Sequence, residues 1–297
     1  MTIMGDMDLV YNDPQSIEKR DILLQENKTL THYHLDALQI AKTVCGLKGQ
    51  RVLEVGGSMP KNVVFGGHEV ARWFSVEDFD YWNELPSHSS GPHYDKVQNV
   101  LANASAPDTL PSHNVFRGKI EDLPIAFHGQ FDRIFSVACF EHVHNLGYAL
   151  EKMWDALCPG GKLFSLFTPI WSAHDGHHLP EITDKQGNTY KFGQSPIPPW
   201  GHLMMTPPEM FSYLCKKTDS ETAGKMVYYV YHSPHINRLF AENYVEYFSS
   251  SKFKTQLIGD AAPMTGQEET LKILRKLHPR YSKFLSNGLV VVLEKKD

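Results

Sequence analysis

The segment at residues 51–60, RVLEVGGSMP, most constrains what this chain can fold into. Apolar residues flank a single acid, Glu54, and run directly into Gly56 and Gly57. A buried parallel strand ends in this way, in a tight turn where the backbone can approach a ligand closely. The segment therefore predicts the first strand of a nucleotide-binding α/β sheet, whose ligand is a dinucleotide or another nucleoside cofactor.

Strand and helix patterns alternate from residue 51 to residue 171, and this alternation predicts a doubly wound, mostly parallel sheet with helices on both faces. Further strands are expected at 71–78, within 113–124, within 131–143, at 162–171 and at 287–296. Helices are expected at 61–68, 145–157, 207–217, 235–249 and 266–285. The segment 225–232, KMVYYVYH, reads as a strand or as an aromatic-lined part of a pocket.

An acid ends the second predicted strand, ARWFSVED. Glu77 lies roughly twenty residues beyond the glycine turn, where an acid in nucleotide-binding sheets holds the ribose hydroxyls. An acid after a strand can also be a simple helix N-cap. Because the glycine turn and the acid occur together, we favour the ribose interpretation.

Five signals follow one another in a characteristic order: VLEVGG, the acid after strand two, EDLP, FDRIFSVACFEHV and a helix ending in LCPGGKL. This order resembles class I S-adenosylmethionine-dependent methyltransferases, in particular their small-molecule, type 11-like branch. The resemblance covers roughly residues 50–170. It implies a Rossmann-like, seven-stranded sheet, methyl transfer as the activity and S-adenosylmethionine as the cofactor.

By this resemblance, the cofactor contacts the residues at the ends of the first four strands. Glu54 would lie under its methionine end, with Gly56 and Gly57 letting the backbone approach. Glu77 would accept hydrogen bonds from the ribose hydroxyls, with Asp78 beside it. The adenine edge and the sulfonium would meet the remaining cofactor residues, which are Ile120, Glu121, Ser136, Val137 and Ala138. His142 would open the next helix, beside the sulfonium.

Two departures from the family pattern bear on the cofactor site. Ser58 and Pro60 stand where the family turn usually continues with glycine, and Lys119 replaces the acid before the adenine-contacting residue. They leave open a relative that kept the fold and lost the chemistry. A nicotinamide-dependent oxidoreductase is a further alternative, although the chain lacks a full GxGxxG.

The domain organisation follows from the same patterns. We expect residues 1–48 to form an N-terminal helical lid and residues 49–171 the cofactor-binding core. Residues 172–286 would be a substrate-binding insertion with helices, and residues 287–297 the final core strand. A helical segment before the first strand can equally pack on the sheet, so both roles stay open for the N-terminal part.

The insertion supplies candidates for a general base, because histidine titrates close to neutral pH. His177 and His178 stand with Asp175 in HDGHH, and His202 follows in PPWGHL. These histidines could serve the substrate, tie the insertion down as a polar cluster, or bind a metal. We predict no metal site, and we take His177, His178, His202 and His142 as the catalytic candidates.

The charge, hydropathy and cysteine content of the chain exclude several classes of binding partner. The net charge of −5 argues against a nucleic-acid binder, and no apolar run reaches the roughly 18 residues of a membrane span. Four scattered cysteines and an N-terminus unlike a secretory signal favour a reduced, cytoplasmic protein. We therefore expect methylation of an O or N atom of a small molecule, such as a secondary metabolite or a modified sugar.

Overall fold

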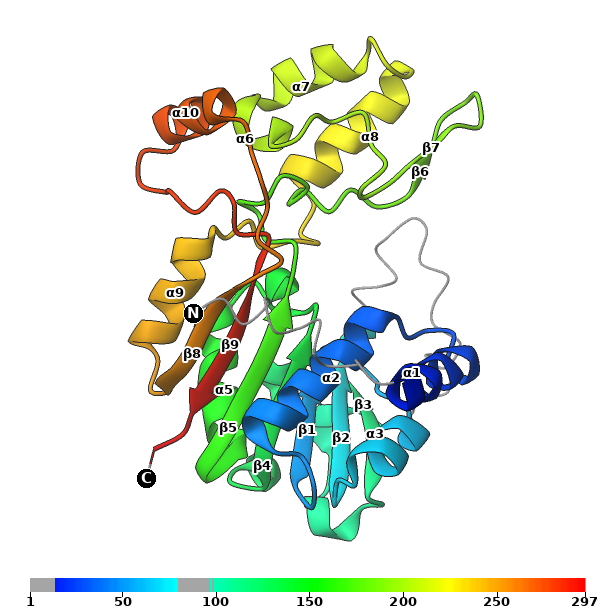
Figure 1. Ribbon diagram of the computed structural model, residues 1–297, viewed down its shortest axis with the longest axis vertical. Coiled ribbons are helices and arrows are strands. Elements are labelled where there is room, and N and C mark those ends of the chain that lie inside the picture. Colours follow the sequence, from blue (N-terminus) through cyan, green and yellow to red (C-terminus); the bar gives the residue numbers. More distant parts are fainter. Residues whose placement is uncertain (1–13, 80–96, 98, 297) are drawn as a thin grey trace.

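A seven-stranded sheet forms the centre of the computed structural model, which describes residues 14–79, 97 and 99–296 (Figure 1). Its spatial order is β3-β2-β1-β4-β5-β9-β8. The strands are β1 (Arg51–Val55), β2 (Arg72–Glu77), β3 (His113–Arg117), β4 (Phe131–Val137), β5 (Leu157–Phe167), β8 (Lys254–Ala261) and β9 (Gly288–Glu294). The first five are parallel, and β9 runs antiparallel between β5 and β8. The predicted doubly wound, mostly parallel sheet is confirmed.

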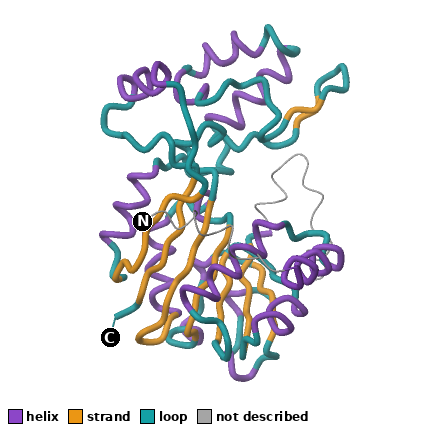
Figure 2. The backbone as a smooth tube through the Cα atoms, viewed as in Figure 1, coloured by secondary structure: helices purple, strands orange, loops and turns teal. Residues whose placement is uncertain are grey.

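Helices cover both faces of the sheet (Figures 1 and 2). Side chains alternate between faces along each strand, so Val52 packs with α2 (His32–Cys45) and α3 (Lys61–His68), whereas Leu53 faces α5 (Leu146–Ala156) and α9 (Ala241–Ser250). On the α5 side, buried phenylalanines gather around Phe74, with ring centroids 5.5 to 6.0 Å away. Each such buried ring stabilises the fold by about 2–3 kcal/mol.

The N-terminal helices are α1 (Pro14–Glu26) and α2. The buried side of α2, including Leu38 and Ala41, packs on the sheet against β4 and β5. Of the two roles left open for this segment, α2 therefore takes the second, as a layer on the sheet. Its amino end reaches the carboxyl end of β5, where the Tyr33 hydroxyl donates to the Leu166 carbonyl over 3.2 Å.

A second layer of helices lies beyond the carboxyl ends of the parallel strands, and we call it the cap (Figure 1). It contains the hairpin β6 (Ile182–Thr183) and β7 (Thr189–Tyr190), and the helices α6 (Gly201–Met204), α7 (Pro207–Leu214), α8 (Ser220–Tyr231) and α10 (Glu268–Leu277). The cap has a hydrophobic core of its own, which includes Trp171, Trp200 and Phe284. The chain enters the cap after β5, leaves it for α9 and β8, and returns before β9.

Two elements differ from the sequence predictions. The segment predicted as a strand at 225–232 forms the second half of helix α8, up to Tyr231, because the buried residues Ala223, Met226 and Val230 recur at helical spacing. Strand β8 was not predicted at all, although it completes the sheet within the expected insertion at 172–286. As an edge strand it is largely exposed and carries little apolar alternation.

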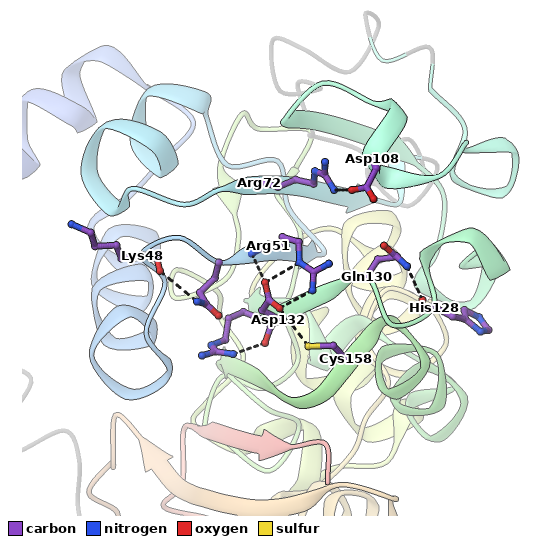
Figure 3. A network of polar contacts seen from close by, with 10 residues as sticks. Lys48, Arg51, Arg72, Asp108, His128, Gln130, Asp132 and Cys158 are labelled. Carbon is purple, nitrogen blue, oxygen red and sulfur yellow. Dashed lines mark hydrogen bonds and ion pairs between the residues drawn. The ribbon is translucent and has the colours of Figure 1, made fainter. Parts of the chain in front are cut away.

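A polar network holds the amino ends of β1 and β4, at the end of the sheet that faces away from the cap (Figure 3). The Arg51 side chain donates to both oxygens of Asp132 over 3.0 and 2.8 Å, and the Arg51 amide donates over 2.9 Å. Burial opposes ionisation of Asp132, but these hydrogen bonds prevail and lower its pKa to about 2. The network fixes the amino ends of the strands, far from the cap.

Candidate active site

A pocket of about 290 Å³ opens at the carboxyl ends of β1, β2 and β4, beside the loop that follows β3. Parallel α/β sheets bind ligands at this edge, because the crossover connections diverge there. The lining comes from four loops and one cap residue: Val55, Gly56, Val76, Glu77, Asp78, Gly118, Lys119, Ile120, Glu121, Ala138, Cys139, His142, Val143, His144 and Pro234. Six of the predicted cofactor residues and one predicted catalytic histidine are among them.

Gly56 forms the floor of the pocket where β1 ends. Its φ is +77°, and a Cβ there would lie 2.2 Å from the sulfur of Cys139. Its amide donates to the Val76 carbonyl over 2.8 Å. Glycine is therefore required both by the backbone conformation and by the close approach of the loop after β4.

Glu54 and Gly57 do not line the pocket. One oxygen of the buried Glu54 carboxylate accepts three hydrogen bonds, from the Met59 amide (2.8 Å), the Trp73 indole (2.8 Å) and the Ser75 hydroxyl (2.6 Å). Burial raises the pKa of Glu54, and these donors oppose the rise. A Cβ on Gly57 would lie 2.3 Å from the other Glu54 oxygen. Both residues thus shape the turn that carries Gly56.

Charged side chains gather on the wall formed by the ends of β2 and β3. Glu77 is 7% exposed, and Asp78 follows it along the wall. The Lys119 ammonium lies 3.6 Å from an Asp78 oxygen, so the lysine that departs from the family pattern faces an acid within the pocket. Beyond Lys119 come Ile120, which is buried, and Glu121, whose pKa is raised by burial.

At the end of β4, Ala138 lines the pocket, whereas the two residues before it, Ser136 and Val137, do not. The Ser136 hydroxyl donates to the Val55 carbonyl over 2.9 Å and ties β4 to β1. Val137 packs in the core against α2 and α3. Ala138 lines the pocket with a φ of +48°, a left-handed conformation that is strained for a residue with a Cβ.

His142 ends a short 3-10 helix, η7 (Phe140–His142), and lines the pocket. Its Nδ1 must carry the proton, because it donates to the His235 carbonyl of the cap. Burial lowers the pKa of His142 to about 4, so the ring is neutral at pH 7. The ring stacks on His178, with centroids 5.1 Å apart.

The other candidate histidines lie inside the cap. His177 is fully buried, and its Nδ1 accepts from the Leu179 amide over 3.1 Å. His202 donates from Nε2 to the Trp171 carbonyl over 2.8 Å, and its ring lies 5.5 Å from that of His177. Burial lowers the pKa of His177 to about 3 and that of His202 to about 4. Neither residue lines the pocket. His178 does not line it either, but its ring stacks on that of His142, which does.

No three metal-binding side chains are suitably grouped in the part of the chain that the structure describes. The same described residues contain no helix long and apolar enough to cross a membrane.

Several pocket residues were missed by the sequence interpretation. Cys139, Val143 and His144 flank η7, and their neighbour His142 in the FEHV motif was the available signal. Cys139 is not a candidate nucleophile, because burial raises its pKa far above neutrality. Pro234 comes from the cap, about ninety residues later in the chain, and no local pattern marks it.

A comparison with protein families found a match within the chain. Residues 88–165 match the family model of the methyltransferase domain. No curated protein matches the chain.

Solved structures similar to the chain include S-adenosylmethionine-dependent methyltransferases. One from Mesorhizobium loti is 13% identical, with 88% of this chain and 99% of that chain covered and a TM-score of 0.44. A putative one from Listeria monocytogenes is 12% identical, with coverages of 90% and 100% and a TM-score of 0.48. A Haloferax volcanii complex of the Trm112 methyltransferase activator and a putative methyltransferase is 13% identical, with 98% of both chains covered and a TM-score of 0.46.

The family match and the pocket at the carboxyl ends of a sheet ordered β3-β2-β1-β4-β5-β9-β8 carry the assignment. The chain carries a methyltransferase domain on a Rossmann-like seven-stranded sheet, the arrangement of S-adenosylmethionine-dependent methyltransferases.

Proposed function

We propose that the protein transfers a methyl group to an O or N atom of a small molecule bound between the pocket and the cap. One observation carries this proposal: the pocket at the strand ends is completed by Pro234, which belongs to the cap. A methyl donor held at the strand ends would therefore face the cap. An acceptor enclosed between the two is a small molecule, such as a secondary metabolite or a modified sugar.

The pocket residues fit S-adenosylmethionine. Glu77 would accept hydrogen bonds from the ribose hydroxyls, and Gly56 leaves the space that the bound nucleoside needs. Ile120 and Glu121 would meet the adenine edge, with Ala138 and His142 at the other end of the pocket. When bound, the cofactor supplies a methyl group on a positively charged sulfur, and the protein aligns the attacking atom with it.

The acceptor side is formed by three rings that lead outward from the pocket. His142 stacks on His178, and Phe192 lies edge-on to His178 with centroids 5.7 Å apart. Burial lowers the pKa of His142 and of His178, so this row of rings is uncharged at pH 7. Phe192 is 46% exposed at its outer end. A planar or largely apolar acceptor matches this wall.

Among the four candidate histidines, His142 lines the pocket, and it would take the proton from the acceptor. With Nδ1 protonated, its Nε2 is the nitrogen with a lone pair. A pKa of about 4 makes it a weak base, which suits an acceptor that ionises readily or attacks as a neutral amine. His177, His178 and His202 would then orient the cap and the ring wall and would not accept the proton themselves.

All four cysteines are free, which supports a reducing compartment such as the cytoplasm. The cap is proposed as the acceptor-binding part of residues 172–286. Helix α2 is proposed to act as a layer of the core, with Tyr33 at the carboxyl end of β5.

Calorimetric titration with S-adenosylmethionine and S-adenosylhomocysteine tests the proposal. The wild-type protein should bind both at micromolar concentrations, and Glu77→Ala should weaken binding at least about tenfold, because two charge-assisted hydrogen bonds are lost. Glu151→Ala, on the exposed face of α5, is the matched control and should bind normally. Absence of binding by the wild type would overturn the proposal. Binding of a nicotinamide dinucleotide instead would favour the oxidoreductase. Tight binding of S-adenosylmethionine without turnover of any acceptor would favour the non-catalytic relative.

A further inference from the structure

Asn237 lies in the cap segment between α8 and α9 and reaches back to η7, which lines the pocket. Its backbone amide donates to the Glu141 carbonyl over 2.9 Å. Its side-chain nitrogen donates to the carbonyls of Phe140 and Val143, over 2.7 and 3.0 Å. Three backbone carbonyls in and next to η7, those of Phe140, Glu141 and Val143, thus accept from one residue of the cap.

The carbonyl oxygen of the same side chain binds in the other direction. It accepts from the Leu239 amide over 3.1 Å and from the Tyr244 hydroxyl of α9 over 2.8 Å. Both hydrogens of the amide nitrogen and both lone pairs of the oxygen are used. Of the polar side chains, only an amide donates twice and accepts twice on adjacent atoms, so this arrangement is specific for the residue type.

The segment held by Asn237 forms one wall of the pocket. Cys139, His142, Val143 and His144 on this segment line the pocket, and the cap contributes Pro234 beside them. Two further hydrogen bonds join the same segments, from His142 to the His235 carbonyl and from His144 to the Pro234 carbonyl. Asn237 itself does not line the pocket.

We propose that Asn237 is a positioning residue for methyl transfer, which fixes η7 and thereby His142 relative to the cap. The affinity for the cofactor then depends on a cap residue that does not touch it. This inference rests on the proposed function, because it assumes that the pocket binds S-adenosylmethionine.

Substitutions can separate the hydrogen bonds that the Asn237 side chain donates to η7 from those that it accepts from Leu239 and Tyr244. Asn237→Asp keeps an oxygen that accepts from Leu239 and Tyr244, but it presents a carboxylate to the carbonyls of Phe140 and Val143. Tyr244→Phe removes only the hydrogen bond from α9 and leaves the contacts with η7. Both variants lose buried hydrogen bonds, so both should be less stable than the wild type.

The experiment measures S-adenosylhomocysteine affinity by calorimetry and unfolding by urea for the wild type and both variants. Asn237→Asp should weaken binding at least about tenfold, whereas Tyr244→Phe should stay within about twofold of the wild type despite its loss of stability. If Asn237→Asp does not fold, Asn237→Ser, which keeps one donor without adding charge, should weaken binding at least about threefold.

Binding within twofold of the wild type by the folded Asn237 variant would overturn the inference. So would equal losses of affinity in the Asn237 and Tyr244 variants, because Asn237 would then act only through general stability. If the wild type itself does not bind, the proposed function fails, and this outcome is distinct from the first two.

Discussion

Glu141 carries a carboxyl group buried where η7 meets the cap, and one of its oxygens has no hydrogen-bond partner. Burial raises the pKa of Glu141 to about 8, although the amides of Glu141 and Thr168 oppose the rise. The group is therefore neutral at pH 7. A raised pKa means that the folded state holds a proton that the unfolded chain has released, so stability from this group is lost as the pH rises toward 8.

Glu141→Gln should remove this pH dependence. Glutamine keeps an oxygen for the two amides and never ionises. We expect the variant to be more stable than the wild type by about 2 kcal/mol at pH 8.5, with little difference at pH 5. Urea unfolding at both pH values measures the effect. Equal differences at the two values would show that ionisation of Glu141 does not matter.

The sequence predicted the glycine turn after β1 but not the structural role of each residue in it. Gly56 lines the pocket as expected. The carboxylate of Glu54 faces the turn instead, since its donors Trp73 and Ser75 come from the neighbouring strand β2. A local pattern identifies a turn, whereas the partners of a buried carboxylate depend on which strand lies beside it.

Helix α8 shows where element prediction failed and which signal was available. The aromatic and β-branched run at 225–232 has high strand propensity, but packing against α7 and the cap core prevails. An N-cap stands in front of it: the Asp219 carboxylate accepts from the amides of Glu221 and Thr222, both over 3.1 Å. That capping position predicts a helix beginning near residue 220.

Asp219→Ala should lower the melting temperature by a few degrees, because the first turn of α8 loses its capping acceptor. Asp219→Asn keeps a side-chain oxygen and should retain most of the stability. Thermal unfolding followed by circular dichroism compares the three proteins. If alanine and asparagine behave alike, the cap of α8 does not contribute through hydrogen bonding.

The whole molecule is divided into a core sheet and a cap, and the cap contains several buried, neutral histidines. Burial lowers the pKa of His177, His202 and His235, to between about 3 and about 4. The unfolded chain binds these protons near pH 6.5, whereas the folded chain resists them. Stability is therefore lost as the pH falls from about 6.5 toward 4.

The wild type should lose stability between pH 7 and pH 5, by up to about 2 kcal/mol for each buried imidazole. His202→Gln should reduce this loss, because glutamine can still donate to the Trp171 carbonyl but does not titrate. His232→Gln, at an exposed histidine, is the control and should leave the loss unchanged. Urea unfolding at pH 7, 6 and 5 gives the three slopes, and identical slopes would contradict the role of burial.

The alternating core, the glycine turn and an acid at the end of β2 could all be predicted from the sequence, since strand period, turn chemistry and the residue that ends a strand are local properties. Tertiary structure alone decided that β8 joins the sheet, because an exposed edge strand needs little apolar pattern once β9 offers its backbone. It also decided which of the candidate histidines lines the pocket. His142 and His178 lie 36 residues apart in the chain and meet only because the cap folds back over the strand ends.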